Sequence, residues 1–448
     1  MEDTICAIST ALGVGGISII RVSGDSSIKI VNSLFRGANL EMTDSHTIHY
    51  GHIVFDDEII DEVLVSVMKA PKTYTTEDIV EINLHGGIAT TNRILELLLI
   101  SGCRLAEPGE FTKRAFLNGR IDLVEAEAVG EIINAENESA RALSMNQLTG
   151  KLSDIIRSLK ERILALEAKI EVNIDYPEYE DIEDMTQSKV RDELHDICGA
   201  VSKMISESKT GQMIKDGLDV AIVGKPNVGK SSILNFLLEE DKAIVTDIEG
   251  TTRDVVEGRM SLNGISINFI DTAGIRNTED VVEKIGVSKS LKKIDEADLV
   301  ILVLNNNESL SEEENSLLES LKNKRHIVFV NKDDLENKLV LDTEDVVRGN
   351  TVSKDGLDAL KGKICDMFEL NELPKKDFTY ISNARQLAHI QMVEKSVLKA
   401  IEGLDDNLTV DIIMIDLEEA RLHLSELLGE VYDEELIDEL FSRFCLGK

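Results

Sequence analysis

The spacing of hydrophobic residues changes several times along the chain and separates strand-like regions from helix-like ones. Short apolar runs at 17–22, 62–67 and 78–82 predict β-strands, and residues 89–100 have the spacing of a helix. Mixed elements of this length indicate a small α+β domain at the start of the chain.

From about residue 118 onward, apolar residues recur every three or four positions, which is typical of one helix face. The first such face is predicted to contain Leu152, Ile155, Leu159, Ile163, Leu166 and Ile170. An acidic loop around Pro177 follows, and we expect a second helix at 186–214. Helical spacing returns after Pro374, with stripes formed by Leu387, Ile390, Val393, Val397 and Ile401, by Leu417, Ala420, Leu424 and Leu427, and by Leu436, Leu440 and Phe444.

A second strand-rich region separates these two helical stretches. Because the helical stretches have no other partners, we infer one helical domain into which the strand-rich region is inserted. The predicted domains are residues 1–117 (N-terminal α+β), 118–216 (first helical segment), 217–368 (inserted domain) and 369–448 (second helical segment). The predicted fold class is therefore multidomain α/β.

The inserted region begins with a phosphate-binding motif. Residues 224–231 read Gly-Lys-Pro-Asn-Val-Gly-Lys-Ser, between a predicted strand at 219–224 and a predicted helix at 232–238. The glycines let backbone N–H groups turn toward phosphate oxygens, and the start of the helix adds positive potential there. We expect Lys230 to reach the β- and γ-phosphates and Ser231 to coordinate Mg²⁺.

Two later motifs identify the nucleotide. Residues 271–274 read Asp-Thr-Ala-Gly after an apolar run, where an Asp can hold the Mg²⁺ shell and a Gly N–H can meet the γ-phosphate. Residues 331–334 read Asn-Lys-Asp-Asp after another apolar run. The carboxylate of Asp334 can accept hydrogen bonds from guanine N1–H and its N2 amino group, which adenine does not offer in that arrangement. These motifs predict a Ras-like GTPase domain.

One position separates this domain from Ras-like enzymes that use a glutamine to orient the attacking water. That position is Ile275, which neither donates nor accepts a hydrogen bond, so the chain must recruit a polar group elsewhere. The segment at 250–254, Gly-Thr-Thr-Arg-Asp, lies between the first two motifs and contains a threonine for Mg²⁺.

Composition and charge restrict the partners. The chain has 448 residues, with 48 Lys+Arg against 84 Asp+Glu, and a formal charge of −36 that disfavours independent binding to nucleic acid or to an anionic membrane. Five scattered cysteines without a C-x-x-C pair suit a reducing compartment. No apolar run approaches 18 residues, and we see no signal peptide, so we expect a cytoplasmic protein outside the membrane.

Several longer motifs together resemble the MnmE/TrmE family, the tRNA uridine-5-carboxymethylaminomethyl modification GTPases. The resemblance covers essentially the whole chain. It is carried by the stretches at 15–24, 74–81, 85–87, 107–118, 174–177, 246–254, 383–385 and 444–448. The Glu-Pro-Gly-Glu-Phe-Thr run that begins at Glu107 and the terminal Phe-Cys-Leu-Gly-Lys are the most specific of these.

The resemblance implies a tetrahydrofolate-binding and dimerising N-terminal domain, and a GTPase whose G domains pair in a K⁺-dependent way within a homodimer. It implies an MnmG/GidA-type flavoprotein partner and modification of the wobble uridine (position 34) of certain tRNAs at C5. A carboxymethylaminomethyl or aminomethyl group is added there, with a one-carbon unit from a 5-formyl or 5,10-methylene tetrahydrofolate. The tRNA is bound through the complex.

The resemblance also assigns residues to sites. The predicted GTP-binding residues are Asn227, Val228, Gly229, Lys230, Ser231, Ser232, Thr246, Asp247, Ile248, Glu249, Gly250, Thr251, Thr252, Asp271, Thr272, Ala273, Gly274, Asn331, Lys332 and Asp334. Ser231 and Thr252 are assigned to Mg²⁺, and Asn227, Thr246, Ile248 and Thr251 to K⁺. Glu283 is predicted to hold the attacking water, with Lys230 as the second catalytic residue. The folate contacts are Arg21, Glu81, Arg120 and Lys448.

Some alternatives remain open at this point. The guanine-backing element near 350–354 aligns in two ways, and we name only Thr351 to Ser353. Cys445 is either a nucleophile or carrier thiol or a buried structural cysteine, and the second reading is favoured. The acidic loop at 175–184 is a solvated face or a docking surface for a basic partner. The alternative function is an Era/Der-like GTP-dependent RNA or ribosome assembly factor.

Overall fold

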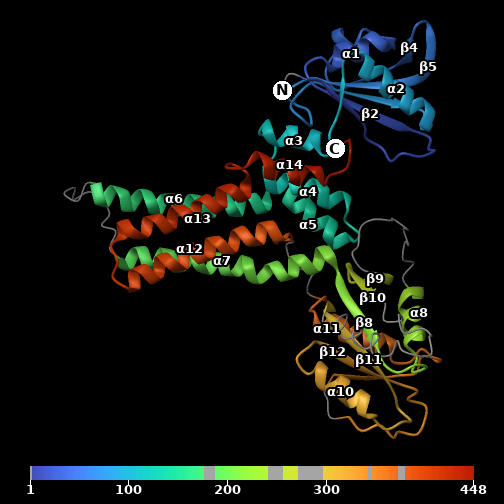
Figure 1. The fold of residues 1–448 in the computed structure, drawn as a ribbon, viewed down its shortest axis with the longest axis vertical. Helices are drawn as coiled ribbons and strands as arrows, with labels where there is room; N and C mark the ends of the chain where they lie inside the picture. The colour runs from blue at the N-terminus through green and yellow to red at the C-terminus, as the bar shows by residue number, and fades with distance from the viewer. Residues whose placement is uncertain are drawn as a thin grey trace, which may run out of the picture. The chain divides into compact units, whose positions relative to one another are not determined.

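The computed structural model describes most of the chain and divides it into two compact units. The described residues are 3–175, 187–240, 256–270, 296–341, 345–371 and 379–447. The first unit contains residues 1–134, 144–205 and 384–448, and the second contains 135–143 and 206–383. Each unit has its own sheet, and Figure 1 shows the helices and strands with their labels.

The first unit contains a seven-stranded sheet with the order β3-β4-β5-β6-β2-β1-β7. All pairs are antiparallel except β1 with β7. The elements are β1 (Ile5–Ile8), β2 (Ser18–Ser23), α1 (Ser27–Leu34), β3 (Phe35–Arg36), the 3₁₀ turn η1 (Leu40–Met42), β4 (Thr47–Phe55), β5 (Glu58–Met68), β6 (Ile79–Leu84), α2 (Ile88–Ile100) and β7 (Arg104–Leu105). Helices α1 and α2 bury Ile28, Val31, Ile94 and Leu97 in the core that the strands form beneath them.

Helices make up the rest of the first unit. They are α3 (Glu110–Leu117), α4 (Leu123–Ile133), α5 (Glu138–Leu148), α6 (Lys151–Asp175), α7 (Gln187–Asp216), α12 (Ala384–Asp405), α13 (Val410–Leu428) and α14 (Glu434–Ser442), with α5 and α7 running on into the second unit. Helix α13 packs against both α12 and α6, so the two helical stretches predicted to associate do so. Apolar side chains at positions three or four apart form their common core.

Two positions in the predicted helix stripes are wrong. Ile155 is 41% exposed, and its neighbour Ile156 is fully buried. Leu436 is 49% exposed, and its neighbour Ile437 is buried. In both cases two adjacent residues are apolar, so the spacing alone allowed either one to face the core.

The second unit contains a six-stranded sheet with the order β13-β12-β11-β8-β10-β9. Only β9 with β10 is antiparallel. The elements are β8 (Leu218–Val223), α8 (Lys230–Glu240), β9 (Val256–Leu262), β10 (Ile265–Ile270), β11 (Leu299–Asn305), α10 (Glu312–Leu321), β12 (His326–Asn331), β13 (Val346–Arg348) and α11 (Leu357–Met367).

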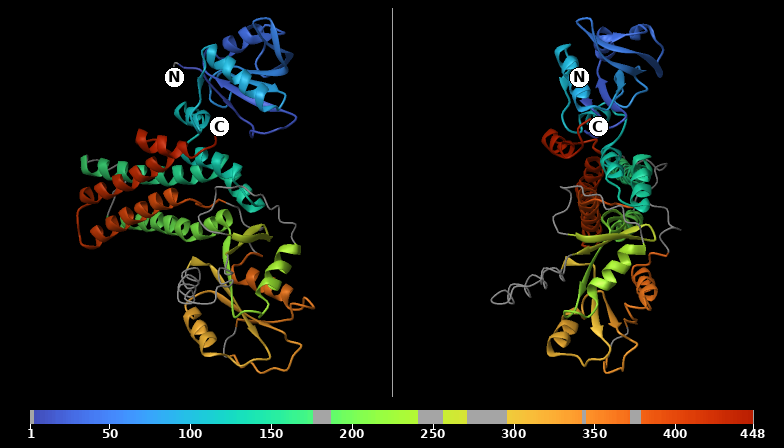
Figure 2. Two further views of the ribbon diagram at one scale, coloured as in Figure 1. Left: turned by 45° about the vertical axis from the view of Figure 1, so that its right-hand side comes forward. Right: turned by 90° about the vertical axis from the view of Figure 1, so that its right-hand side faces the viewer.

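Helices cover both faces of this sheet, as Figure 2 shows from two further directions. Alternate residues of β8, β11 and β12 pack with α8 and α11 on one side and with α10 on the other. All seven residues of β11 are buried for this reason. In such a sheet, loops at the carboxyl ends of the strands form the ligand site, and the predicted motifs begin at these ends.

Candidate functional site

The phosphate-binding motif forms the turn between β8 and α8. Gly224 and Gly229 have φ angles of +145° and +109°, which residues with a side chain rarely adopt. A methyl group on Gly224 would lie 2.4 Å from the carbonyl oxygen of Val303, and one on Gly229 would lie 2.3 Å from Nδ2 of Asn331. The loop therefore requires both glycines, as the motif predicts.

Lys230 stands at the first position of α8, and its side chain folds back over the loop. Its Nζ donates to the carbonyl oxygens of Gly224 (2.6 Å) and Lys225 (2.7 Å). Burial lowers the pKa of this amine. An anion placed at the loop would supply a counter-charge for this half-buried ammonium. Asn227 and Ser231 are exposed beside it.

The Asn-Lys-Asp-Asp motif joins this loop to a third loop. Asn331 ends β12 and is buried; its Nδ2 donates to Val228 O (2.7 Å), and its Oδ1 accepts from the backbone N–H of Thr351 (3.0 Å). Asp334 is exposed, and its Oδ1 accepts from Nδ2 of Asn350 at 2.8 Å. The structure thus brings Asp334 and the 350–353 segment to one end of the sheet, although the sequence left the alignment of that segment open.

Several predicted residues lie outside the described residues. They are Thr246, Asp247, Ile248, Glu249, Gly250, Thr251, Thr252, Asp271, Thr272, Ala273, Gly274, Ile275, Glu283 and Lys448, and most of the acidic loop at 175–184. Their assignments stay predictions.

The N-terminal domain brings together the three described residues of the predicted folate site. Arg21 on β2 faces Glu81 on β6 across the sheet, and its Nε and Nη2 donate to Oε1 of Glu81 at 2.9 and 2.8 Å. The guanidinium of Arg120 lies over the ring of Tyr74 at 4.8 Å, and that of Arg21 approaches the same ring at 5.5 Å. Arg120 also donates to the carbonyl oxygen of Tyr74 (2.9 Å). Tyr74 had no predicted role, although it stands in one of the motifs of the resemblance.

A cavity of about 520 Å³ opens beside Arg120. Its lining includes Thr73, Tyr74, Asn118 and Arg120, so an aromatic ring, a cation and several polar groups face one space. This combination suits a small ligand that has both a flat ring and an anionic group.

The last described residues of the chain return to this domain. Gly447 O accepts from Oγ of Ser9 (3.0 Å) and from Nη1 of Arg21 (3.4 Å). Gly447 has a φ of +88°, and a methyl group there would lie 2.3 Å from Ile8 O. The chain end thereby reaches the pair formed by Arg21 and Glu81.

A buried arginine holds the loop that carries Tyr74. Arg114 on α3 is fully buried and donates to both oxygens of Glu77 (3.1 Å each), to Asp3 Oδ1 (2.8 Å) and to Glu110 Oε1 (3.0 Å). Burial alone would raise the pKa of Glu110, but hydrogen bonds from Arg104, from the backbone N–H of Glu107 and from Arg114 outweigh it and lower the pKa. The sequence reading assigned Arg114 no role because its partners are scattered along the chain.

Cys445 is exposed, beyond the end of α14 at Ser442. The favoured interpretation as a buried structural cysteine is therefore wrong. The chain turns after α14, and the backbone of Cys445 is held by a hydrogen bond from Gly109 N–H to its carbonyl oxygen (3.3 Å), which leaves the thiol outside the core.

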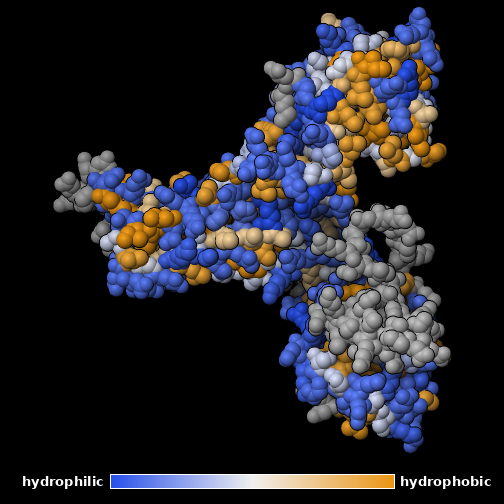
Figure 3. All heavy atoms as spheres, viewed as in Figure 1, coloured by the Kyte–Doolittle hydropathy of each residue, from blue (hydrophilic) through white to orange (hydrophobic). Residues whose placement is uncertain are grey.

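None of the helices in the described ranges is long and apolar enough to cross a membrane. Figure 3 shows hydrophilic residues over much of the visible helical surface, with smaller hydrophobic areas between them.

Known proteins resemble the chain over its full length. Family models described as GTP-binding protein TrmE N-terminus and MnmE helical domain match residues 4–120 and 123–445. The tRNA modification GTPase MnmE of Streptococcus thermophilus is 50% identical over 452 residues, covering 100% of this chain and 98% of that protein. The same-named protein of Enterococcus faecalis is 48% identical over 457 residues, with the same coverage.

Solved GTPase structures match one part of the chain. An Aquifex aeolicus Era variant bound to GDP and AlF₄⁻ is 28% identical, covers 40% of this chain and 66% of its own, and has a TM-score of 0.26. The G domain of the T. maritima FeoB iron transporter is 27% identical, covers 33% of this chain and 97% of its own, and has a TM-score of 0.23. These scores are too low to carry an argument. The assignment rests instead on the family models and the full-length relatives. The chain belongs to the MnmE family of tRNA modification GTPases and is a GTP hydrolase.

Proposed function

We propose that this chain is a K⁺-stimulated GTPase that acts with an MnmG/GidA-type flavoprotein on the wobble uridine of certain tRNAs. The reaction adds a carboxymethylaminomethyl or aminomethyl group at C5 and takes a one-carbon unit from a tetrahydrofolate derivative. One observation carries the proposal: the chain contains a nucleotide loop on one sheet and a separate ligand cavity beside another sheet. An Era/Der-like assembly factor would need only the first.

The nucleotide loop fits Mg²⁺–GTP. The two glycines leave space that a Cβ would fill, and the half-buried Lys230 holds carbonyl oxygens that phosphate oxygens would replace. In this proposal Ser231 and Thr252 hold Mg²⁺, which neutralises phosphate charge when bound. Asp334 selects guanine, and Asn331 fixes the distance between the guanine loop and the phosphate loop through its bond to Val228.

We assign the monovalent-cation site to Asn227 and the backbone of Thr246, Ile248 and Thr251. The exposed side-chain amide of Asn227 supports this assignment, because its oxygen is a suitable ligand for K⁺. A cation there would stabilise the charge that develops during hydrolysis. Glu283 would orient the water that Ile275 cannot bind.

We assign the N-terminal cavity to the folate derivative. Arg120 lines the cavity and supplies a cation for the glutamyl carboxylates. Glu81 and Arg21 lie outside the cavity lining: Arg21 approaches the ring of Tyr74 and holds Glu81, which offers an acceptor for the N–H edge of the pterin. Tyr74 offers a ring against which a flat pterin can pack. Lys448 is the fourth proposed contact, and the approach of Gly447 to Arg21 supports its placement.

Two surface features support the proposed partners. On the outer face of the sheet, Ile48, Tyr50 and Leu64 are 67%, 61% and 48% exposed, and Tyr50 pairs with Leu64 across β4 and β5. Apolar side chains on an open sheet face favour homodimerisation. The exposed acidic segment at 430–435 favours a basic partner that also supplies tRNA affinity.

The test is a reconstitution with the purified flavoprotein, unmodified tRNA, GTP, a methylene-tetrahydrofolate and glycine or ammonium. Mass spectrometry of the digested tRNA should show the modified uridine only when both proteins, K⁺ and the folate are present. Asp334→Asn should shift the preferred nucleotide from GTP to xanthosine triphosphate, and Arg120→Ala should remove modification but keep GTP hydrolysis. Modification without the folate, or equal hydrolysis in K⁺ and Na⁺ at matched ionic strength, would contradict the proposal.

A further inference from the structure

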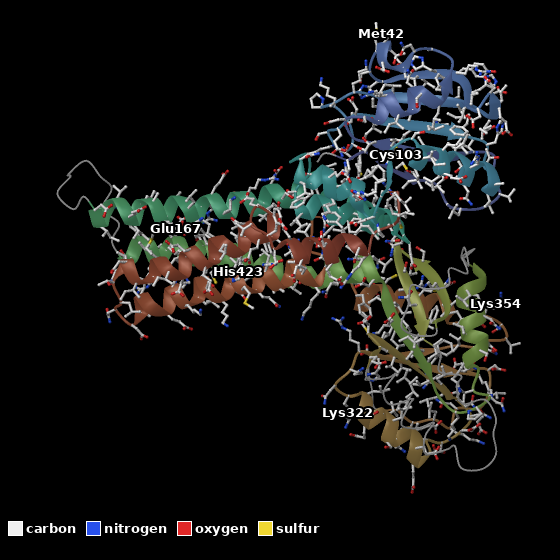
Figure 4. All side chains as sticks on the ribbon, turned by 45° about the horizontal axis from the view of Figure 1, so that its top comes forward. Met42, Cys103, Glu167, Lys322, Lys354 and His423 are labelled. Carbon is white, nitrogen blue, oxygen red and sulfur yellow. The ribbon has the colours of Figure 1, made fainter. Side chains whose placement is uncertain are left out.

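Helices α12 and α13 place three metal-ligating side chains together, and none of the three belongs to the two sites described above. His389 lies near the start of α12, while His423 and Glu426 lie three residues apart on one face of α13. Their ligand atoms all lie within 4.8 Å of one another. Figure 4 labels His423 on the helical bundle.

The glutamate bridges the two histidines. Oε2 of Glu426 lies 3.0 Å from Nδ1 of His423 and 3.5 Å from Nδ1 of His389. The two imidazole rings are 5.9 Å apart between centroids. Two imidazoles and a carboxylate that converge on one point form the donor set that proteins use for zinc.

The surroundings of His389 favour its neutral form. Burial lowers the pKa of His389, and the guanidinium of Arg385 lowers it further, against the carboxylates of Glu426 and Glu127. Arg385 does not fill the site itself, because its Nε and Nη2 donate to Glu127 at 2.6 and 3.0 Å. A neutral imidazole is the form that binds a metal.

We propose that His389, His423 and Glu426 form a binding site for a divalent transition-metal ion, best matched by Zn²⁺, that joins α12 to α13. The fourth position of a tetrahedral ion would be filled by water. Imidazole nitrogens disfavour Mg²⁺, which prefers oxygen, so the site is distinct in chemistry from the nucleotide site. The side chains are 20%, 20% and 34% exposed, which leaves a path for the ion from solvent.

The geometry needs only side-chain movement to close on an ion. Zinc binds imidazole nitrogen at about 2.0–2.1 Å, so two ligand atoms of one tetrahedral ion lie roughly 3.4 Å apart. Both distances from Glu426 Oε2 are already close to this value. The nitrogens of the two imidazoles lie within 4.8 Å of each other, so small rotations of the side chains would bring all three ligand atoms to one ion.

The test uses the full chain, stripped of metal with a chelator and titrated with Zn²⁺ by isothermal calorimetry without nucleotide. We expect one ion per chain. His389→Gln, His423→Gln and Glu426→Gln should each weaken binding at least tenfold. His195→Gln is the matched control, because His195 is exposed on α7 outside the cluster, and it should leave the affinity unchanged. Cys445→Ser should also leave it unchanged, which excludes capture by the exposed thiol.

Cobalt provides a readout that does not depend on the folding of variants. Co²⁺ added to the unaltered chain should give the visible absorption bands of a four-coordinate site, and Zn²⁺ should remove them. Circular dichroism checks that each variant keeps its helices. The proposal is overturned if the unaltered chain gives no such bands, or if folded His389→Gln and His423→Gln variants bind Zn²⁺ as tightly as the parent.

Discussion

Replacing Arg114 by Met should destabilise the N-terminal domain more than any exposed charge replacement. The substitution keeps a long side chain in a fully buried position but removes the guanidinium that contacts Asp3, Glu77 and Glu110. Two of these carboxylates, Glu77 and Glu110, are only 10% and 7% exposed. The variant therefore buries negative charge without its counter-ion.

The structure indicates how large the effect should be. Glu110 and Asp3 keep a second cation, because Arg104 donates to both of them at 2.6 Å. Glu77 has no basic partner other than Arg114 among the ion pairs of the described residues, so the loss corresponds mainly to one buried carboxylate that keeps a hydrogen bond from Ser23 but has no counter-ion. Removing one partner of a buried ion pair typically costs about 3–5 kcal/mol. Hydrogen exchange should then accelerate by roughly 10²–10⁴-fold in amides that exchange through global opening of this domain.

Hydrogen-exchange mass spectrometry is the appropriate assay because it reports on each unit separately, whereas a single melting curve would mix them. Peptides from β2 and β6 should lose protection in Arg114→Met, while those from β8 and β11 should not. Arg93→Met is the control, since Arg93 and Glu96 form an exposed pair whose loss should change stability by less than about 0.5 kcal/mol.

The effect of Arg114→Met should also depend on pH. In the folded parent, the pKa of Glu110 is lower than in the unfolded chain. The ionised carboxylate therefore stabilises the fold above the unfolded pKa, and this stabilisation is lost as pH falls through the folded-state pKa. In the variant, Glu110 keeps Arg104 but loses the hydrogen bond from Arg114, so its pKa is lowered less and acidification costs the variant less stability than it costs the parent. The gap between parent and variant should therefore be widest at pH 7 and shrink toward pH 4. A change in protection below threefold, or a gap that widens on acidification, would refute this reasoning.

Three further predictions concern the other domains. Gly229→Ala should weaken GTP binding in calorimetry by about a hundredfold, because the added methyl would meet Nδ2 of Asn331 at 2.3 Å. Gly362→Ala, in the interior of α11 with no atom near the new methyl, should leave GTP affinity unchanged and raise the unfolding free energy by about 0.5–1 kcal/mol in urea titrations. Burial raises the pKa of Glu167, although the guanidinium of Arg421 opposes this shift. Ionisation of Glu167 therefore lowers the stability of the fold as pH rises above the unfolded-state pKa of this carboxyl. Glu167→Gln should therefore gain stability relative to the parent between pH 4 and pH 7 in thermal unfolding of the helical domain.

The nucleotide loop could be predicted from sequence because its residues are local and each has a specific backbone requirement. Gly224 and Gly229 adopt positive φ angles within one turn, and the Asn-Lys-Asp-Asp motif follows a strand whose burial is visible in its composition. The family resemblance also carried Arg21, Glu81 and Arg120, which no local pattern would have joined. The pairing of Arg21 with Glu81 and the approach of both arginines to Tyr74 depend on the register of β2 with β6 and on the loop before β6.

Other features depend on contacts that spacing does not encode. Arg114 reaches Asp3 across 111 positions, and His389 meets His423 only because α12 and α13 lie side by side. Ile156 and not Ile155 faces the core. Both side chains are equally apolar, so the elements packed against α6 determine which of the two is buried. Residues 135–143 belong to the second unit although their sequence looks like the helical domain, because Ala140 and Leu143 pack into the core of the second sheet.

The contact between Ser9 and Gly447 spans 438 positions, and it has a consequence for how the protein is made. A ribosome will have released the whole of the N-terminal sheet long before Gly447 is synthesised, so the sheet forms while one side of Arg21 is still open. That side closes only after Gly447 has been synthesised. Nascent or truncated chains that lack Gly447 would therefore carry a folded sheet in which the side of Arg21 that Gly447 contacts is still open.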